Sequence, residues 1–112
     1  MIMMLVGLDE QRVDNDGYDV KSMWDIVDEA FSYGKCEKEV QPDGTVLYKG
    51  NINSTNLMAD FYYAYARLSQ NPYFAKYCTK WIEYTNEQDE SQPFTYEDYL
   101  EGEREDNPLF QQ

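Results

Sequence analysis

Residues 36–52 read CEKEVQPDGTVLYKGNI, and this stretch decides the fold class. A Pro-Asp-Gly sequence at residues 42–44 stands between two short runs that tolerate the β conformation. Proline presets φ at the start of a turn and glycine accepts positive φ at its end, so the triplet predicts a tight turn. Val46, Tyr48 and Ile52 would share one face under strict alternation, which is the two-residue period of a strand. The stretch therefore predicts a β-hairpin over residues 37–52.

The rest of the chain adds a strand and several helices. An apolar run at residues 2–8 is compatible with a strand. Later in the chain, apolar residues recur at helical spacing, and polar caps such as Asp19 and Asn71 precede two of these segments. Pro72 is typical of a first helical position. We expect helices near residues 19–33, 55–70, 72–85 and 96–103, and a loop over residues 9–18.

These elements predict an α+β fold. The expected architecture is a small antiparallel sheet, made of the N-terminal strand plus the 37–52 hairpin, packed against three to four helices. The chain has 112 residues, which suits one domain. We expect a single compact domain over residues 1–106 and a frayed tail over residues 107–112. The aromatic residues expected to share the core are Trp24, Phe61, Tyr65, Phe74, Tyr77 and Trp81.

Charge is unevenly distributed along the chain. Nine basic and 22 acidic side chains give a formal net charge of −13, with no histidine. Residues 9–29 hold eight acids and two bases, residues 30–81 hold four acids and six bases, and residues 82–106 hold ten acids and one base. A protein that binds nucleic acid directly needs a basic face, and an anionic membrane repels an acidic one. The sequence therefore predicts neither direct nucleic-acid binding nor membrane binding.

Acidic residues in the last segment predict a partner-binding surface. On the helix expected over residues 96–103 and its continuation, Glu97, Glu101 and Glu105 would share one face, about 5–6 Å apart. Duplex DNA carries a charge per about 1.7 Å of its axis from both strands together, so the phosphates along one strand have a pitch comparable to that of the acids. Such a row of carboxylates therefore resembles a nucleic-acid backbone. Tyrosines among the acids would act as rigid anchors. The predicted partner-binding residues are Glu83, Tyr84, Glu87, Asp89, Glu90, Tyr96, Glu97, Asp98, Tyr99, Glu101, Glu105 and Asp106.

The leading hypothesis is a non-catalytic acidic protein that inhibits a basic nucleic-acid-binding protein, such as a nuclease or effector complex, by DNA or RNA mimicry. The composition is similar to that of phage and mobile-element proteins that mimic DNA to block restriction or CRISPR nucleases. Small immunity proteins against nucleases share this composition, so the alternative is an immunity-type protein that neutralises a toxin through ordinary protein–protein contacts. A third interpretation is that the acidic stripe is only a solvated surface that confers solubility. Residues 9–29 are the other acidic concentration that could contact a partner.

The sequence lacks most of the residues that catalytic and metal-binding sites use. The absence of histidine removes Ser-His-Asp and Cys-His catalysis and the usual zinc ligands. Residues 14–17 resemble part of a calcium loop, but Arg12 and Met23 would occupy ligand positions, so we expect no metal and no cofactor. Lys35 and Lys38 flank Cys36, a pattern that can lower the pKa of a thiol. The apolar start lacks the basic region of a signal peptide, which favours a cytoplasmic protein. The absence of histidine and of catalytic motifs favours a protein that is not an enzyme.

Overall fold

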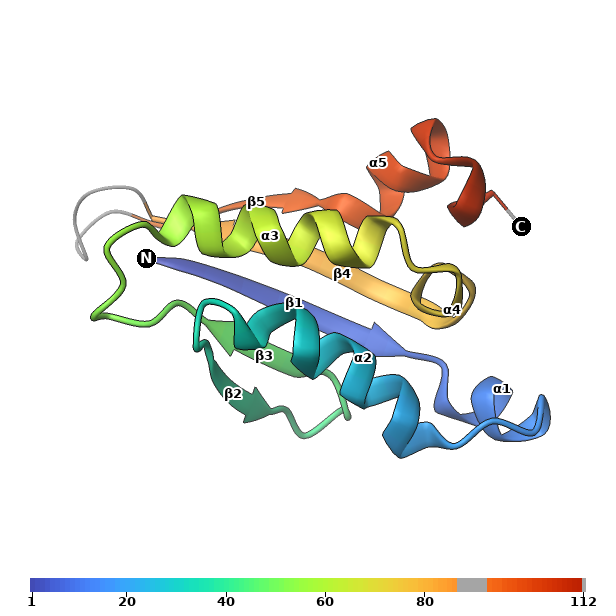
Figure 1. Ribbon diagram of the computed structural model, residues 1–112. Coiled ribbons are helices and arrows are strands. Elements are labelled where there is room, and N and C mark those ends of the chain that lie inside the picture. The colour runs from blue at the N-terminus through green and yellow to red at the C-terminus, as the bar shows by residue number, and fades with distance from the viewer. Residues whose placement is uncertain (87–92, 112) are drawn as a thin grey trace.

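The computed structural model describes residues 1–86 and 93–111. Within these residues, one antiparallel sheet has five strands in the order β2-β3-β1-β4-β5 (Figure 1). The strands are β1 (Ile2–Leu8), β2 (Glu37–Val40), β3 (Val46–Lys49), β4 (Cys78–Thr85) and β5 (Thr95–Asp98). The helices are α1 (Glu10–Asn15), α2 (Val20–Ser32), α3 (Leu57–Ser69), α4 (Pro72–Tyr77) and α5 (Tyr99–Asp106), followed by the 3-10 turn η1 (Pro108–Phe110). The predicted α+β class is confirmed.

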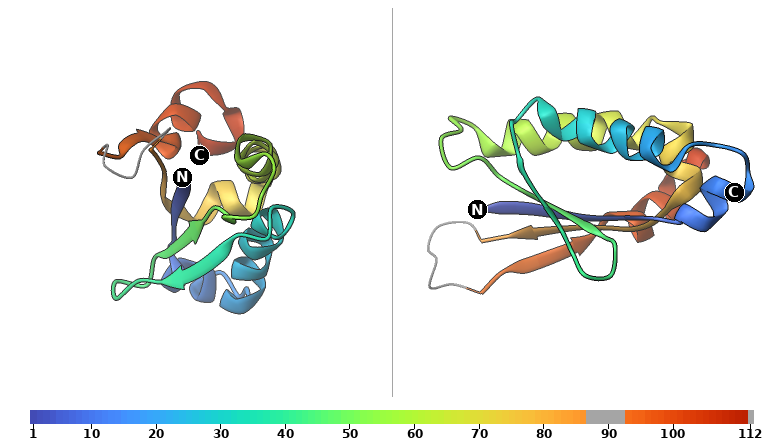
Figure 2. Two further views of the ribbon diagram at one scale, coloured as in Figure 1. Left: turned by 90° about the vertical axis from the view of Figure 1, so that its left-hand side faces the viewer. Right: turned by 90° about the horizontal axis from the view of Figure 1, so that it is seen from below.

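Strand β1 is the central strand of the sheet. Buried and less buried side chains alternate along it, and this alternation explains why helices pack on one face of the sheet. Ile2, Met4 and Val6 are buried on one face, where α2 and α3 lie side by side over the sheet (Figure 2). On its two edges β1 pairs antiparallel with β3 and with β4. The views show no helix over the opposite face of the sheet in the described part of the chain. No helix there is long and apolar enough to cross a membrane.

The predicted hairpin is confirmed. Strands β2 and β3 pair in antiparallel register, and Gly44 has a φ of +87°, the positive value that the turn requires. The Gln41 N–H donates to the Thr45 carbonyl at 2.8 Å and closes the turn. Val46 and Tyr48 are both buried, as the alternation predicts. Ile52, predicted on the same face, is 85% exposed, because β3 ends at Lys49 and the alternation does not continue beyond it.

Residues 72–85 correct the sequence interpretation. A helix was expected throughout, but α4 ends at Tyr77 and residues 78–85 form strand β4. Phe74, Tyr77 and Trp81 fit a helical period, and all three are buried in the structure although Trp81 lies on a strand, so their apolar pattern does not distinguish the two conformations. The deciding factor is remote in sequence, because the second edge of β1 needs a partner for its backbone N–H and C=O groups.

Residues near both ends of the chain also differ from expectation. Thr95–Asp98 forms the edge strand β5, so the last helix begins at Tyr99 and not at residue 96. The Asp98 side chain accepts a hydrogen bond from the Glu101 N–H and caps α5. Residues 9–18, expected to be a loop, contain the short helix α1, which Asp9 caps in the same way.

The core is an aromatic cluster around Trp81. This side chain is 0% exposed, and its ring lies 5.6 Å from that of Tyr65 and 5.1 Å from that of Phe74, measured between centroids. Phe61 is also buried, whereas Trp24 and Tyr65 are only partly buried. Tyr77 is buried in a second cluster, with Val13 and Met23. The six predicted core residues therefore divide between the main cluster, its margin and a satellite.

The expected frayed tail is docked in the structure as far as Phe110. This ring is 5% exposed and stacks 6.1 Å from Trp81. The Asn107 side chain positions the turn, since its carbonyl oxygen accepts from the Leu109 N–H and its amide donates to the Ser69 carbonyl. Burial of a phenyl ring provides the free energy that orders this short segment.

Truncation of the central ring tests the core. Trp81→Ala should lower the free energy of unfolding by about 3–5 kcal/mol, because it removes buried surface and leaves a cavity. Urea titration measures this loss, with Met58→Ala as the control. The Met58 side chain is 75% exposed, so that change should stay within about 0.5 kcal/mol. A loss below about 1 kcal/mol for Trp81→Ala would show that the aromatic cluster does not stabilise the fold.

Candidate functional site

A groove of about 1110 Å³ lies between α3 on one side and β5 and α5 on the other. Tyr65 and Tyr99 line it together with half-buried Glu83 from strand β4. Five acids from three different elements line the groove, and we call them the groove acids: Glu83, Glu97, Asp98, Glu103 and Asp106. Because β5 is an edge strand and α3 lies over the centre of the sheet, the space between them is left open to solvent.

Two of the groove acids lie directly opposite each other on neighbouring strands. Glu83 of β4 pairs directly with Glu97 of β5 in the antiparallel register. Burial, and next the Glu97 carboxylate, raise the pKa of the Glu83 carboxyl above its ordinary value. Like charges directly opposite each other destabilise a sheet, where favourable cross-strand pairs contribute about 0.2–1 kcal/mol. The folded protein therefore maintains this pair at a cost in stability.

Tyrosine hydroxyls hold two of the groove acids in place. The Tyr99 hydroxyl donates to the Glu83 carboxylate, and the Tyr65 hydroxyl donates to Glu103. This hydrogen bond to Glu103, followed by burial, raises the pKa of Tyr65 to about 12. Asn107 also donates to Glu103, at 2.8 Å. Each carboxylate has about four acceptor positions, so the bonded acids can still accept from an incoming cation.

The α3 side of the groove is chemically different. Met58 and Tyr62 lie four residues apart and therefore share one face of α3. Their side chains are 75% and 72% exposed, and both line the groove. We call this pair the apolar wall. The groove thus places two solvent-exposed, largely apolar side chains opposite a row of carboxylates.

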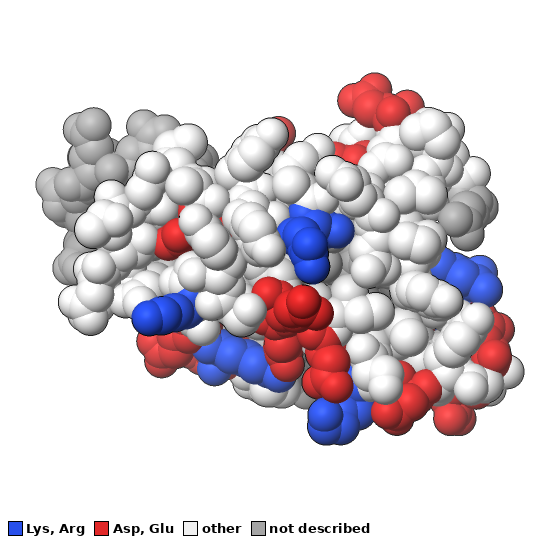
Figure 3. All heavy atoms as spheres, in the orientation of Figure 1, with Lys and Arg blue, Asp and Glu red and all other residues white. Residues whose placement is uncertain are grey.

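The two acidic regions of the chain differ in their ion pairing. In the described part of the chain, five ion pairs occur, and Figure 3 shows acidic and basic side chains side by side along the lower part of one face, over α2. The pairs are Lys21–Asp25, Lys38–Asp28, Lys49–Glu39, Arg67–Glu29 and Lys76–Asp16. None of them involves the acids of residues 83–86 and 93–106.

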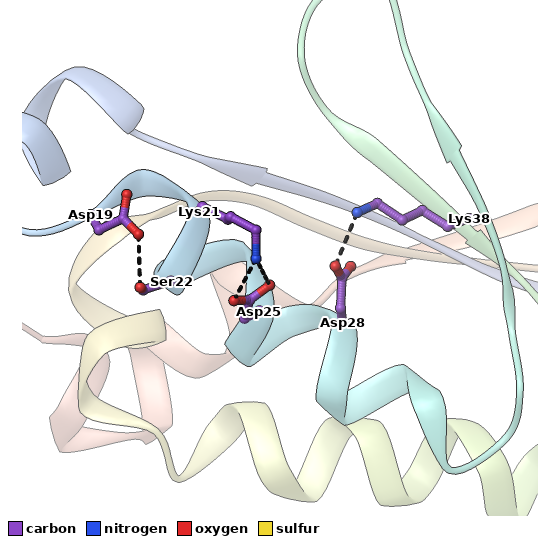
Figure 4. A network of polar contacts seen from close by, with 6 residues as sticks. All are labelled: Asp19, Lys21, Ser22, Asp25, Asp28 and Lys38. Carbon is purple, nitrogen blue, oxygen red and sulfur yellow. Dashed lines mark hydrogen bonds and ion pairs between the residues drawn. The ribbon is translucent and has the colours of Figure 1, made fainter.

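The acids on and around α2 have partners within the fold (Figure 4). The Asp28 carboxylate accepts from Lys38 of β2 at 3.0 Å and from the Tyr48 hydroxyl at 2.6 Å. Asp16 accepts from the Tyr77 hydroxyl, and this bond, followed by Lys76, lowers the pKa of Asp16. Asp19 accepts from the Ser22 hydroxyl. Much of the acidity of residues 9–29 is therefore engaged by the protein itself.

The structure brings together part of the predicted partner-binding set. Glu83, Glu97, Asp98, Tyr99 and Asp106 line the groove. The predicted single helical face is wrong, because Glu97 and Asp98 belong to strand β5 while Glu101 and Glu105 belong to α5.

The other predicted residues lie elsewhere. Glu101 and Glu105 line a separate recess beside Arg104. Tyr84 and Tyr96 are cross-strand neighbours, one residue out of phase with Glu83 and Glu97, and so lie on the opposite face of the sheet. Glu87, Asp89 and Glu90 fall outside the described residues.

Sequence reasoning missed Glu103 and the apolar wall. On a helix that begins at Tyr99, residues Tyr99, Glu103 and Asp106 share one face by their spacing of four and three, so a correct helix start would have identified Glu103. Met58 and Tyr62 carry the same signal as core residues, because apolar residues at helical spacing normally face inward. In the structure they are exposed and line the groove, which the pattern alone does not indicate.

Neither cysteine is activated. Burial, and next the Asp60 carboxylate, raise the pKa of Cys36 to about 11, so the flanking lysines do not favour its thiolate. Burial raises the pKa of Cys78 to about 12. Across residues 1–86 and 93–111, no three Cys, Asp or Glu side chains gather closely enough to hold a metal ion.

Comparisons with protein families, with curated proteins and with solved structures found no match for the chain.

The Glu83–Glu97 pair predicts a pH-dependent gain in stability on neutralisation. The folded pKa of Glu83 is raised, so its contribution to stability falls as the pH rises from the unfolded pKa, about 4.3, through the folded value. Glu83→Gln, which can still accept from Tyr99, should be about 0.2–1 kcal/mol more stable than the native protein at neutral pH. The gain should vanish near pH 4.

Urea unfolding at both pH values measures this difference. Glu101→Gln is the matched control, since Glu101 is exposed and has no acid opposite it on a strand. A variant at Glu83 that is less stable at neutral pH, or a gain that does not change with pH, would contradict the proposed repulsion.

Proposed function

We propose that this protein is a non-catalytic inhibitor that binds a basic nucleic-acid-binding protein in the cytoplasm. Its groove acids would take the place of a DNA or RNA backbone in the partner's binding site. Such an activity is of the anti-restriction or anti-CRISPR type and would belong to a phage or mobile element. The observation that carries the proposal is the concentration of acids in residues 82–106, ten against one base, without an ion pair in the described part.

Unpaired charge of one sign has a direct consequence for association. A cluster of carboxylates raises the local concentration of a basic partner and speeds the encounter, and salt weakens this effect. The cost of the arrangement supports a role in binding, because the Glu83–Glu97 repulsion brings the isolated fold no gain. Lys or Arg side chains of a partner would relieve that repulsion.

The spacing of the groove acids also supports mimicry. Directly opposed residues in an antiparallel pair have Cβ atoms about 4.5–5.5 Å apart, and successive residues on a helix face are about 5–6 Å apart. These intervals suit the partner's nucleic-acid-binding surface, which is built to contact the closely spaced charges of a nucleic-acid backbone. The charges come from two strands and a helix, and not from one helical stripe.

The second candidate is an immunity-type protein that neutralises a toxin through ordinary protein–protein contacts. The exposed apolar wall of Met58 and Tyr62 favours it, because such contacts rely on apolar and tyrosine anchors. Gene neighbourhood separates the two candidates at little cost. A toxin gene directly upstream favours immunity, whereas genes of a phage or conjugative element favour mimicry.

Charge reversal at the groove tests the proposed function. Glu97→Lys combined with Asp106→Lys should weaken binding to a partner captured from the source cell by about 100-fold or more, because both residues line the groove. The matched control is Glu101→Lys combined with Glu105→Lys, which changes the net charge equally but alters the recess beside Arg104. The control should stay within about threefold of the native affinity.

Affinities are measured by titration of the purified partner, and circular dichroism checks that both variants fold. Equal losses in the two variants would show that only overall charge matters. An unchanged affinity in the groove variant would reduce the groove acids to a solubility surface.

A further inference from the structure

The two sides of the groove differ chemically, so a molecule that binds there must present different groups to each side. The groove acids require cationic side chains, whereas Met58 and Tyr62 present exposed apolar surface from α3. A pure copy of a nucleic-acid backbone has no use for such a wall, because exposed methionine and tyrosine contribute no charge. Exposed apolar groups beside a polar rim are typical of a protein-binding surface.

We infer that the groove binds one amphipathic segment of the partner, with Lys or Arg along one side and large apolar residues along the other. The inference rests on the proposed function and specifies its partner. Cationic side chains would pair with the groove acids, and apolar ones would pack on Met58 and Tyr62. This arrangement is the helix-in-groove mode of peptide recognition with one wall charged.

The dimensions of the groove suit a peptide segment. Its volume of about 1110 Å³ exceeds the range of about 300–1,000 Å³ that is usual for small-molecule pockets. Along α3 the lining runs from Met58 to Ser69, which corresponds to about 16 Å of helix at 1.5 Å per residue. A partner helix of about three turns matches this length.

Charge argues against a second copy of this chain as the occupant. The net charge is −13, so a second copy would bring further acids to the groove acids. Of the nine basic residues, five already form ion pairs within the fold. The complementary partner is therefore a different, basic protein.

The apolar wall makes part of the affinity independent of salt. Ion pairs at an exposed groove are screened at high ionic strength, whereas apolar burial is not. Tyr62 is suited to this role, since tyrosine provides contact area at a low cost in conformational entropy. Charge and apolar contact can therefore be separated in one experiment.

The test uses two synthetic helical peptides of about 18 residues with the same number of lysines. One carries leucine on the face opposite the lysines, and the other carries serine there. At about 0.5 M NaCl the leucine peptide should bind the native protein at least tenfold more tightly than the serine peptide. Met58→Ala combined with Tyr62→Ala should weaken the leucine peptide at least fivefold and leave the serine peptide within about twofold at low salt.

The matched control replaces an exposed aliphatic residue and an exposed tyrosine outside the groove. Ile52→Ala combined with Tyr73→Ala should leave both affinities unchanged, since neither residue lines the groove. Equal binding of the two peptides, or no effect of the Met58 and Tyr62 changes, would overturn the inference and leave the proposed function standing. Failure of both peptides to bind at low salt, or binding that Glu97→Lys with Asp106→Lys does not weaken, would overturn the proposed function as well.

Discussion

Packing around the indole of Trp81 is the contact on which the rest of the structure depends. This ring on β4 touches aromatic rings from α3, α4, α5 and the turn after α5, through Tyr65, Phe74, Tyr99 and Phe110. Helices α3 and α5 are the two sides of the groove, so the same cluster that stabilises the fold also sets the groove's width. The packing of the core therefore also positions the two sides of the candidate site.

The acidity of the chain has two different roles. In residues 9–29, acids such as Asp16 and Asp28 bond to lysines and tyrosine hydroxyls of neighbouring elements and help to join them. In the described C-terminal region, Glu83 and Glu103 bond only to neutral donors, which orient the carboxylates without neutralising them. Oriented and uncompensated charge is the arrangement that a site for a basic partner requires. We regard this difference as the physical basis of the proposed function.

Local chemistry made part of the fold predictable and left the rest hidden. The hairpin followed from a Pro-Asp-Gly turn and strict alternation at Val46 and Tyr48, both of which act within a few residues. Strand β4 could not be read because Tyr77, Cys78 and Trp81 suit a helix equally well, and its pairing with β1 spans most of the chain. The acidic concentration was visible in composition. Its geometry was not, because it depends on the β4–β5 register and on the start of α5 at Tyr99.

Competition between this protein and nucleic acid tests the central claim most directly. Binding of a labelled duplex to the purified partner is titrated at several fixed concentrations of this protein. If the groove acids occupy the nucleic-acid site, the apparent Kd of the duplex should rise linearly with the inhibitor concentration from its value without inhibitor, while the bound fraction at saturation stays constant. An unchanged Kd with a falling plateau, or a ternary complex of the two proteins with the duplex, would contradict mimicry.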